Sequence, residues 1–214
     1  MSDALATPAR LAASLNGRLP PPGAKIGLLG GSFNPAHQGH LDLSLAALKR
    51  LGLDEVWWLI TPQNPLKSRS GMAPLKERLT GARHLARHPQ IRPTDIERVL
   101  GTHYTADTLR TLKVRFSRSH FLWLMGGDNL IQLTYWKDWE SIFNLVVVAV
   151  FDRPTYALRA RGGKAARRFA DHRLGESKAK ALACSSPPAW VFLHQRLNPA
   201  SATSIRTRRA AASG

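Results

Sequence analysis

The sequence predicts an α/β protein, a doubly wound parallel sheet with helices on both faces. Three observations predict this fold class. Short apolar runs alternate with longer stretches of helical periodicity along most of the 214 residues. The first apolar run leads through a glycine-rich turn into a helical pattern, the kind of junction at which α/β proteins bind phosphate groups. The length also suffices for one well-buried domain.

The first part of the chain predicts one βαβ unit. Residues 25–30 form a short apolar strand, and residues 55–60, Glu-Val-Trp-Trp-Leu-Ile, form a second one that ends at a proline-containing turn. Between them, residues 38–51 carry leucines at helical spacing, and Gly52 follows as a C-cap. Because a single helix separates the two strands, we expect the strands to be parallel.

The rest of the chain continues the alternation. The clearest central strand is Leu-Val-Val-Val-Ala-Val-Phe at 145–151. Residues 155–183 are alanine-rich, with eight Lys and Arg residues and two acidic ones, and they predict either a solvated helical face or a surface that attracts anionic substrates or acidic partners. The other expected helices are 74–88, 104–116 and 130–143, and the other expected strands are 91–97, 120–125 and 190–194.

Both ends of the chain are predicted to lie outside the domain, which we expect over residues 23–209. Residues 1–22 mix Ala, Ser, Arg and Pro, so we expect a flexible or loosely packed lead-in, and residues 210–214 form a tail. The chain has no apolar run near the ~20 residues of a membrane span and no apolar signal-peptide core at its N-terminus. The single cysteine, Cys184, allows no internal disulfide. We therefore expect a cytoplasmic protein.

The charge balance indicates anionic partners. The 31 Lys and Arg residues oppose 14 Asp and Glu residues, which gives a net charge of +17 and an isoelectric point near 11.3. A field of this sign attracts nucleotides, nucleic acid and anionic membrane surfaces, and the total charge does not choose among them. Nothing in the chain resembles a common nucleic-acid-binding module. We expect no nucleic-acid or membrane partner, and a basic nucleic-acid-binding protein is the alternative from a different functional class.

Two histidines follow the glycine-rich turn. His37 and His40 stand at i, i+3 where the helix of residues 38–51 begins, so that both could point at one anion together with the backbone N–H groups. A metal pair or two unrelated histidines are the other interpretations. A helical zinc pair would have i, i+4 spacing with a glutamate, as in H-E-x-x-H, and this stretch lacks that arrangement.

Polar residues also occur where α/β proteins bind ligands. Asp128 follows a strand and two glycines, and is either a ligand-binding residue at the carboxyl end of that strand or a helix cap. Ser201, Thr203 and Arg206 begin a helical stretch, where hydroxyl groups cap free N–H groups or bind phosphate oxygens. The local pattern alone predicts packing roles for four tryptophans, Trp57, Trp58, Trp136 and Trp139. It predicts solvent-exposed positions for Lys67, His84 and His88.

Four motifs occur along the chain. They are Gly-Gly-Ser-Phe-Asn-Pro-Ala-His-Gln-Gly-His at 30–40, Pro-Gln-Asn-Pro-Leu-Lys at 62–67, Gly-Gly-Asp-Asn at 126–129 and Ser-x-Thr-x-x-Arg at 201–206. The first contains H-x-G-H, the signature of nucleotidylyltransferases, and the set resembles bacterial nicotinate-nucleotide adenylyltransferase over about residues 24–209. The resemblance implies a Rossmann-like nucleotidylyltransferase fold. It also implies a reaction of NAD biosynthesis, in which ATP with Mg²⁺ and nicotinate mononucleotide give deamido-NAD and pyrophosphate.

The resemblance implies a role for each motif residue. His37 and His40 would hold the ATP phosphates, with His40 on the reacting α-phosphate. The β- and γ-phosphates would be held by Ser201, Thr203 and Arg206. Contacts to the nucleotide are implied for Gly30, Gly31, Ser32, Phe33 and, at a ribose hydroxyl, Asp128. Contacts to the nicotinate nucleotide are implied for Asn64, Lys67, Tyr104, Thr105 and Trp136, the last by stacking on the pyridine ring.

Two departures from the family pattern concern the grip on the triphosphate. Ala200 and Ala202 replace an Ile and a Ser, so one hydroxyl is missing, and Asn34 stands where many members have Asp. Neither change removes a charged phosphate ligand. The attacking phosphate is mostly dianionic near neutral pH, because its second pKa is about 6. Transfer therefore needs in-line positioning and charge neutralisation rather than a protein nucleophile.

The acceptor and the assembly remain open at this point. Nicotinamide mononucleotide and pantetheine phosphate are alternative acceptors, against which Tyr104, Thr105 and Trp136 speak by resemblance only. Mg²⁺ would bridge phosphate oxygens and keep most of its waters, so we expect no metal site built from protein side chains. We expect a monomer or a small homo-oligomer.

Overall fold

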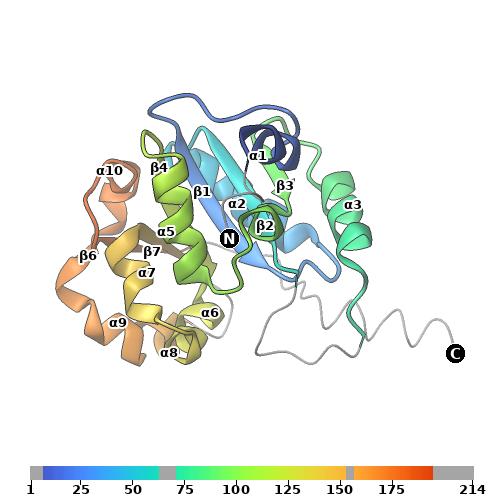
Figure 1. The fold of residues 1–214 in the computed structure, drawn as a ribbon. Coiled ribbons are helices and arrows are strands. Elements are labelled where there is room, and N and C mark those ends of the chain that lie inside the picture. The colour runs from blue at the N-terminus through green and yellow to red at the C-terminus, as the bar shows by residue number, and fades with distance from the viewer. Residues whose placement is uncertain (1–6, 63–70, 153–156, 195–214) are drawn as a thin grey trace, which may run out of the picture.

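The structure is a computed structural model and describes residues 7–62, 71–152 and 157–194. Its centre is a seven-stranded sheet in the order β3-β2-β1-β4-β5-β7-β6, in which every neighbouring pair is parallel (Figure 1). The predicted fold class is thereby confirmed. The strands are β1 (Lys25–Gly31), β2 (Glu55–Ile60), β3 (Ile91–Thr94), β4 (His120–Gly126), β5 (Val147–Phe151), β6 (Arg173–Leu174) and β7 (Trp190–Leu193).

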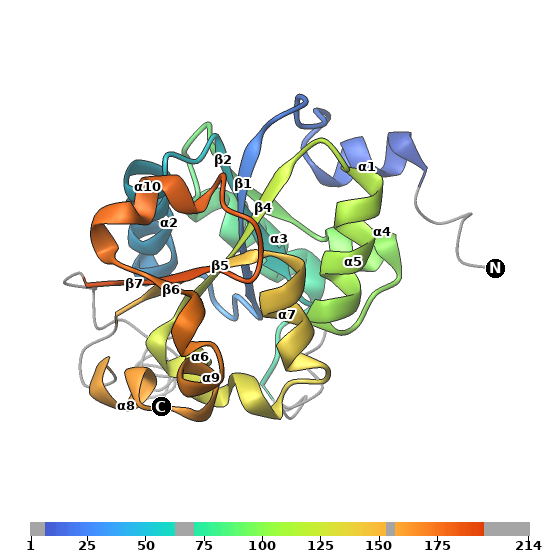
Figure 2. The same cartoon turned by 90° about the vertical axis from the view of Figure 1, so that its left-hand side faces the viewer.

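Helices cover both faces of the sheet, and Figure 2 shows α2 and α10 on one side of the strands and α1, α4, α5 and α7 on the other. α2 ends as its sequence predicts, because Gly52 adopts a left-handed conformation with a φ of 63°. The helices are α1 (Pro8–Ser14), α2 (Gln38–Leu51), α3 (Leu75–Leu85), α4 (Ile96–Leu100), α5 (Thr105–Arg115), α6 (Gly127–Gln132), α7 (Trp139–Leu145), α8 (Ala157–Arg161), α9 (Lys164–Arg168) and α10 (Ala179–Leu182), with short 3-10 turns η2 (Leu133–Tyr135), η3 (Ala170–His172) and η4 (Glu176–Lys178).

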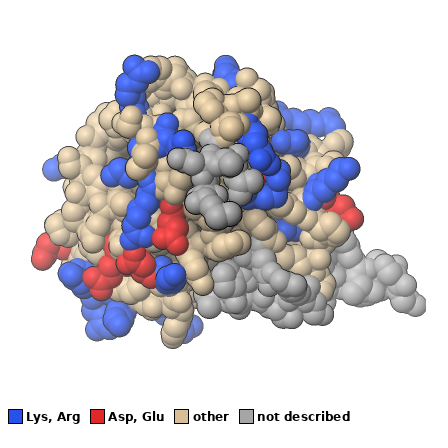
Figure 3. Space-filling model, in the orientation of Figure 1, with Lys and Arg blue, Asp and Glu red and all other residues tan. Residues whose placement is uncertain are grey.

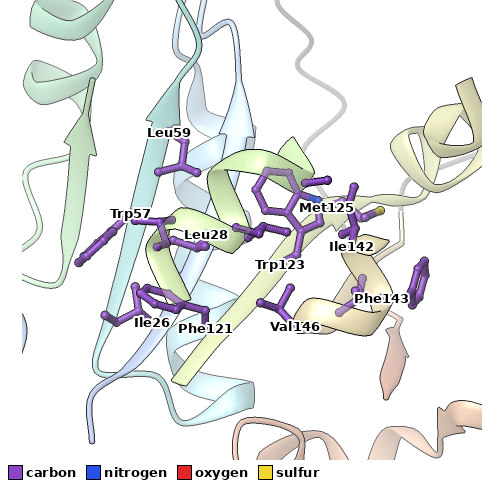
Figure 4. Close-up of a cluster of buried hydrophobic side chains, with 14 of the residues drawn as sticks. Ile26, Leu28, Trp57, Leu59, Phe121, Trp123, Met125, Ile142, Phe143 and Val146 are labelled. Atoms are coloured by element: carbon purple, nitrogen blue, oxygen red, sulfur yellow. The ribbon is translucent and has the colours of Figure 1, made fainter. Parts of the chain in front are cut away.

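Each strand contributes alternate side chains to two hydrophobic layers. On β2, Trp57 and Leu59 face the layer under α4 and α5, whereas Trp58 and Ile60 face the layer under α2 and α3. Figure 4 shows the first of these layers, with Trp57 beside Ile26 and Phe121 at one end. Trp57 and Trp58 are both fully buried, so their prediction as core residues is confirmed.

The order of the strands creates a topological switch point between β1 and β4, at the carboxyl ends of these two strands. From β1 the chain moves outward through β2 to β3, and it then returns to the other side of β1 to form β4. Leu29 of β1 pairs with Leu124 of β4, so both strands run two residues further, to Gly31 and Gly126. Ligands of open α/β sheets bind where strand order reverses in this way. The glycine-rich turn after β1 and the Gly-Gly-Asp turn after β4 therefore meet at the expected place.

Three predicted elements differ from those observed. The expected strand 91–97 ends at Thr94, because α4 begins at Ile96. The expected helix 130–143 is interrupted between α6 and α7, where Asp138 adopts a left-handed conformation with a φ of 52°. The described part of the basic segment, residues 157–183, forms several short helices and turns and the strand β6 rather than one helical face.

The sequence predicts a flexible or loosely packed lead-in over residues 1–22, and the structure shows that residues 8–15 of this lead-in pack against the sheet. These residues form α1 and the turn after it, and Leu11 and Leu15 are buried against the sheet. The buried guanidinium of Arg92 donates to the carbonyls of Leu15 (3.3 Å) and Arg18 (2.7 Å) and forms an ion pair with Glu55. The physical reason is that two leucines on one helix face can bury apolar area that composition alone does not reveal.

Candidate active site

The candidate site begins at the glycine-rich end of β1. A Cβ atom at Gly30 would lie 2.5 Å from the ring of Trp123 on β4, so only glycine fits under this indole. Phe33 follows with a φ of 47°, which is unusual for a bulky side chain. Its ring is 1% exposed and stacks on Trp58 with 5.1 Å between centroids. The burial of Phe33 thus holds the loop in a strained turn at the switch point.

His37 and His40 lie together at the start of α2. The backbone N–H of His37, the N-cap residue, donates to Nδ1 of His40 at 3.2 Å, and the two ring centroids are 3.8 Å apart. Because Nδ1 of His40 accepts this bond, the neutral ring carries its proton on Nε2. Phe33 packs on the other side of the ring, with 4.5 Å between centroids. The orientation and the tautomer of His40 are therefore both set by its neighbours.

The two imidazoles stand at the positive end of a 14-residue helix. The first backbone N–H groups of a helix lack helical partners and bind anions well. Imidazole N–H donors beside such an end form a site suited to a phosphate group. The spacing that predicted one shared anion site thus corresponds to two rings in contact.

The second part of the site follows β4. Gly126 is the N-cap residue of α6, and Asp128 lies half-buried in the first turn of this helix. The cap position is therefore taken by Gly126, which removes the simpler interpretation of Asp128 as the N-cap residue. The carboxylate belongs to the turn across the switch point from the histidine loop.

Of the predicted acceptor residues, Tyr104, Thr105 and Trp136 are described, and they come from the start of α5 and from the turn between η2 and α7. Tyr104 is the N-cap residue of α5, and Lys137 lies over its ring at 4.3 Å. Trp136 is half-buried and packs edge-on against Trp123, with 6.3 Å between centroids. Because Trp123 also covers Gly30, one indole contacts both Trp136 and the end of β1.

An ion-pair network fixes α5 to the turn before α7. Arg110 of α5 binds Asp107 at 2.9 Å and also pairs with Asp138, which in turn accepts a hydrogen bond from Ser141 at 2.8 Å. The hydrogen bond from Arg110 holds the pKa of the exposed Asp138 carboxyl below its usual range. This network keeps the N-terminal half of α5, which begins with Thr105, beside the segment that carries Trp136.

Glu97 is a titratable residue of this region that the motifs do not predict. It lies on α4, is 5% exposed, and accepts a hydrogen bond from Thr108 of α5 at 3.3 Å. Burial raises the pKa of Glu97 to about 7, against the opposing effect of hydrogen bonds from Thr61 and Thr108. Thr108 also shares a hydrogen bond with Thr102 (2.8 Å), so Glu97 supports the segment that leads to Tyr104. No pattern in the sequence distinguishes this glutamate from a solvated one.

Arg78 is a second residue that the motifs do not predict, and a signal for it does exist. Leu75, Leu79 and Ala82 pack inward from α3, and Arg78 lies on the same face. A cation on the apolar face of a helix needs buried partners, which the structure supplies as backbone carbonyls around the histidine loop.

Five of the predicted site residues lie outside the described residues. They are Asn64, Lys67, Ser201, Thr203 and Arg206.

Within the described ranges, no group of three or more His, Cys, Asp or Glu side chains could hold a metal ion. The thiol of Cys184 is exposed. None of the described helices is long and apolar enough to cross a membrane. Lys and Arg side chains are spread over the face in Figure 3, with fewer Asp and Glu side chains among them. On this face the positive side chains are therefore scattered rather than gathered in one stripe.

Comparisons with known proteins agree on one family. Residues 28–208 match the cytidylyltransferase-like family. A protein of Parvibaculum lavamentivorans named "Probable nicotinate-nucleotide adenylyltransferase" is 51% identical over 187 residues, which cover 87% of this chain and 93% of the relative. A protein of the same name from Methylorubrum extorquens is 50% identical over 184 residues, 86% of this chain and 100% of the relative.

A solved structure shares the fold. Plasmodium falciparum nicotinic acid mononucleotide adenylyltransferase complexed with NaAD matches with a TM-score of 0.63 and 17% identity, over 85% of this chain and 82% of that one. The same enzyme complexed with APC matches with a TM-score of 0.63 and 16% identity, over 86% of this chain and 83% of that one.

Proposed function

Because this chain belongs to the nicotinate-nucleotide adenylyltransferase family, we infer that it transfers AMP from ATP to nicotinate mononucleotide, giving deamido-NAD and pyrophosphate for NAD biosynthesis. The observation that carries this inference is the identity of about half the residues over nearly the whole length of such relatives. The pair of histidines at the switch point of the sheet agrees with it, since phosphate chemistry belongs at this edge.

The reaction is a single displacement at the α-phosphorus of ATP. A phosphate oxygen of nicotinate mononucleotide forms a new bond to this phosphorus, while the bond to the bridging oxygen of the β-phosphate breaks and pyrophosphate leaves with that electron pair. The attacking phosphate is largely dianionic near neutral pH. It therefore needs no general base, and no protein nucleophile takes part. The protein contributes alignment and stabilisation of negative charge.

His40 is the residue that we assign to the reacting phosphate. Its Nδ1 accepts the His37 N–H, so the neutral ring carries its proton on Nε2, and we assign this N–H to an oxygen of the α-phosphate. The ring is held by His37 and Phe33, which means that little reorganisation is needed as charge develops. His37 and the N-terminal N–H groups of α2 would hold a neighbouring part of the triphosphate.

The other residues of the ATP site are assigned by position. The backbone of Gly30, Gly31, Ser32 and Phe33 would face the nucleotide, and the Asp128 carboxylate would accept a hydrogen bond from a ribose hydroxyl. Ser201, Thr203 and Arg206 would bind the β- and γ-phosphates, an assignment that rests on the family motif. Glycine is required at 30 because Trp123 fills the space above it.

The acceptor site is assigned to the opposite side of Trp123. Trp136 would stack on the pyridine ring, and the start of α5 at Tyr104 and Thr105 would bind the nicotinate carboxylate through N–H groups. Asn64 and Lys67 would lie near the phosphate of the nicotinate nucleotide, again by the family motif.

Mg²⁺ is expected to enter as part of the substrate. His37 and His40 offer imidazole nitrogens at the start of α2. Mg²⁺ prefers oxygen ligands and retains several waters. The ion would be held by the phosphate oxygens of ATP, where it neutralises charge on the leaving pyrophosphate.

An acceptor panel tests the proposed function. The protein is incubated with Mg²⁺ and ATP and, in turn, nicotinate mononucleotide, nicotinamide mononucleotide, pantetheine phosphate or no acceptor, and pyrophosphate release is measured. We expect the fastest release with nicotinate mononucleotide and none without an acceptor. Equal or faster turnover with another acceptor would overturn the nicotinate assignment. In the same assay, His40→Ala tests the role of the histidine assigned to the reacting phosphate. His84→Ala, which changes an exposed histidine of α3, is its control.

A further inference from the structure

Arg78 on α3 is a buried arginine whose hydrogen-bond partners among the described residues are all backbone carbonyls. It is 4% exposed, and its guanidinium donates to the carbonyls of Ser32 (2.6 Å), Thr61 (2.9 Å), Pro62 (3.0 Å) and Ala73 (2.9 Å). No carboxylate of the described part of the chain forms an ion pair with it. Burial lowers the pKa of Arg78, and no acidic side chain of the described residues opposes this effect.

The four carbonyls belong to three separate segments. Ser32 lies in the turn after β1 that leads to the histidines, Thr61 and Pro62 follow β2, and Ala73 precedes α3. The forked guanidinium can reach all of them at once because its donors point in different directions in one plane. One side chain therefore fixes the turn after β1 relative to the residues on both sides of segment 63–70.

Asn34 makes a second connection between the same segments. Its amide nitrogen donates to the carbonyl of Gly71 at 2.9 Å, and its carbonyl oxygen accepts the N–H of Ala73 at 3.2 Å. The turn after β1 is thus held to residues 71–73 from two directions, by Arg78 and by Asn34. In the proposed function the turn after β1 belongs to the ATP side, and Pro62 begins the motif that is assigned to the acceptor.

Arg92 shows what a buried arginine with a purely structural role looks like in this protein. It is equally buried, but it pairs with Glu55 and holds the carbonyls that follow α1. Its charge is thus compensated within the fold. Among the described residues no carboxylate compensates the charge of Arg78. An uncompensated buried charge costs stability, but it suits a position beside a site for two phosphorylated substrates.

We propose that Arg78 is a positioning residue for adenylyl transfer, which holds the turn after β1, the end of β2 at Thr61 and Pro62, and Ala73 in one arrangement. This proposal rests on the proposed function. The proposal has a specific kinetic consequence. Without the guanidinium of Arg78 the two substrates are misaligned, so kcat falls while the dissociation constant for ATP changes little.

The test compares Arg78→Lys with the matched control Arg92→Lys. Lysine keeps the charge but presents its donors from one nitrogen, so it cannot bridge three segments. We expect Arg78→Lys to lower kcat roughly 10- to 100-fold. The dissociation constant for α,β-methylene-ATP should stay within about threefold of the wild-type value. Arg92→Lys should lower the melting temperature and leave kcat of the folded protein unchanged.

Wild-type kinetics in a folded Arg78→Lys variant would overturn the proposal. So would an equal loss of kcat in Arg92→Lys, because the effect would then be one of general stability. If Arg78→Lys does not fold, Asn34→Ala takes its place, since it breaks the same connection from the other side; unchanged kcat in that variant would also refute the proposal. The proposed function is judged separately, by pyrophosphate release from the wild-type protein with nicotinate mononucleotide.

Discussion

Replacing Glu97 with glutamine should change the stability of the protein in a pH-dependent way. Compared with the wild type, the variant should gain free energy of unfolding as the pH rises from acid to alkaline. The Glu97 carboxyl lies between α4 and α5, where burial raises its pKa from 4.5 to about 7. Glutamine has nearly the same volume and accepts the same hydrogen bond from Thr108, but it carries no charge at any pH.

The size and the sign of this effect follow from proton linkage. The folded protein binds the Glu97 proton more tightly than the unfolded chain does, so the contribution of this group to stability is fully present below pH 4.5 and is lost as the pH rises through 7. Each pKa unit corresponds to about 1.4 kcal/mol. The rise from 4.5 to about 7 therefore represents ~3 kcal/mol of the free energy of unfolding, lost by the wild type and not by Glu97→Gln.

The assay is urea unfolding of both proteins at pH 5 and at pH 8. The difference in the free energy of unfolding between Glu97→Gln and the wild type should shift in favour of the variant by ~2.5 kcal/mol from pH 5 to pH 8, because at pH 5 part of the contribution is already lost. Any pH-independent cost of the amide cancels in this comparison. Glu77→Gln, at an exposed position of α3, should show no such shift. A difference that is the same at both pH values would refute the reasoning about Glu97.

Three further predictions concern the candidate site. His40→Ala should lower kcat by roughly 10²- to 10³-fold with the fold intact, because a donor to developing charge is lost; near-normal kcat would contradict the role of His40. Gly30→Ala should destabilise the protein by about 1–3 kcal/mol in thermal unfolding, since its Cβ would lie 2.5 Å from Trp123, whereas Gly81→Ala on α3 meets no atom within 4 Å and should not destabilise it; equal stability of the two variants would argue against the close packing at 30. Trp136→Ala should mainly raise KM for nicotinate mononucleotide; an effect confined to the affinity for ATP would show that the stacking assignment is misplaced.

Much of the fold was predictable because its signals are local. The alternation of apolar runs and helical stretches gives the parallel sheet, and Gly52 ends α2 as expected. The approach of His37 to His40 was also predictable, because i, i+3 residues at a helix start share one side. These predictions depend on neighbours in the sequence, which a single chain reveals.

Contacts between distant segments were not predictable in the same way. Arg78 looks like any helical arginine until Ser32 and Thr61 are placed around it by the sheet. Glu97 becomes a titratable group near neutral pH only because α4 and α5 enclose it. The break in the helix at Asp138 could not be predicted from the sequence, because the surrounding residues suit a helix. The turn is held by an ion pair with Arg110, which comes from another helix.

The most direct test of the proposed site is a crystal structure with α,β-methylene-ATP and nicotinate mononucleotide bound. We predict an oxygen of the α-phosphate within about 2.7–3.2 Å of His40 Nε2. We also predict a ribose hydroxyl at the Asp128 carboxylate and the pyridine ring stacked on Trp136. A triphosphate bound away from the turn after β1, with His40 Nε2 in contact with solvent only, would contradict the site and the mechanism together.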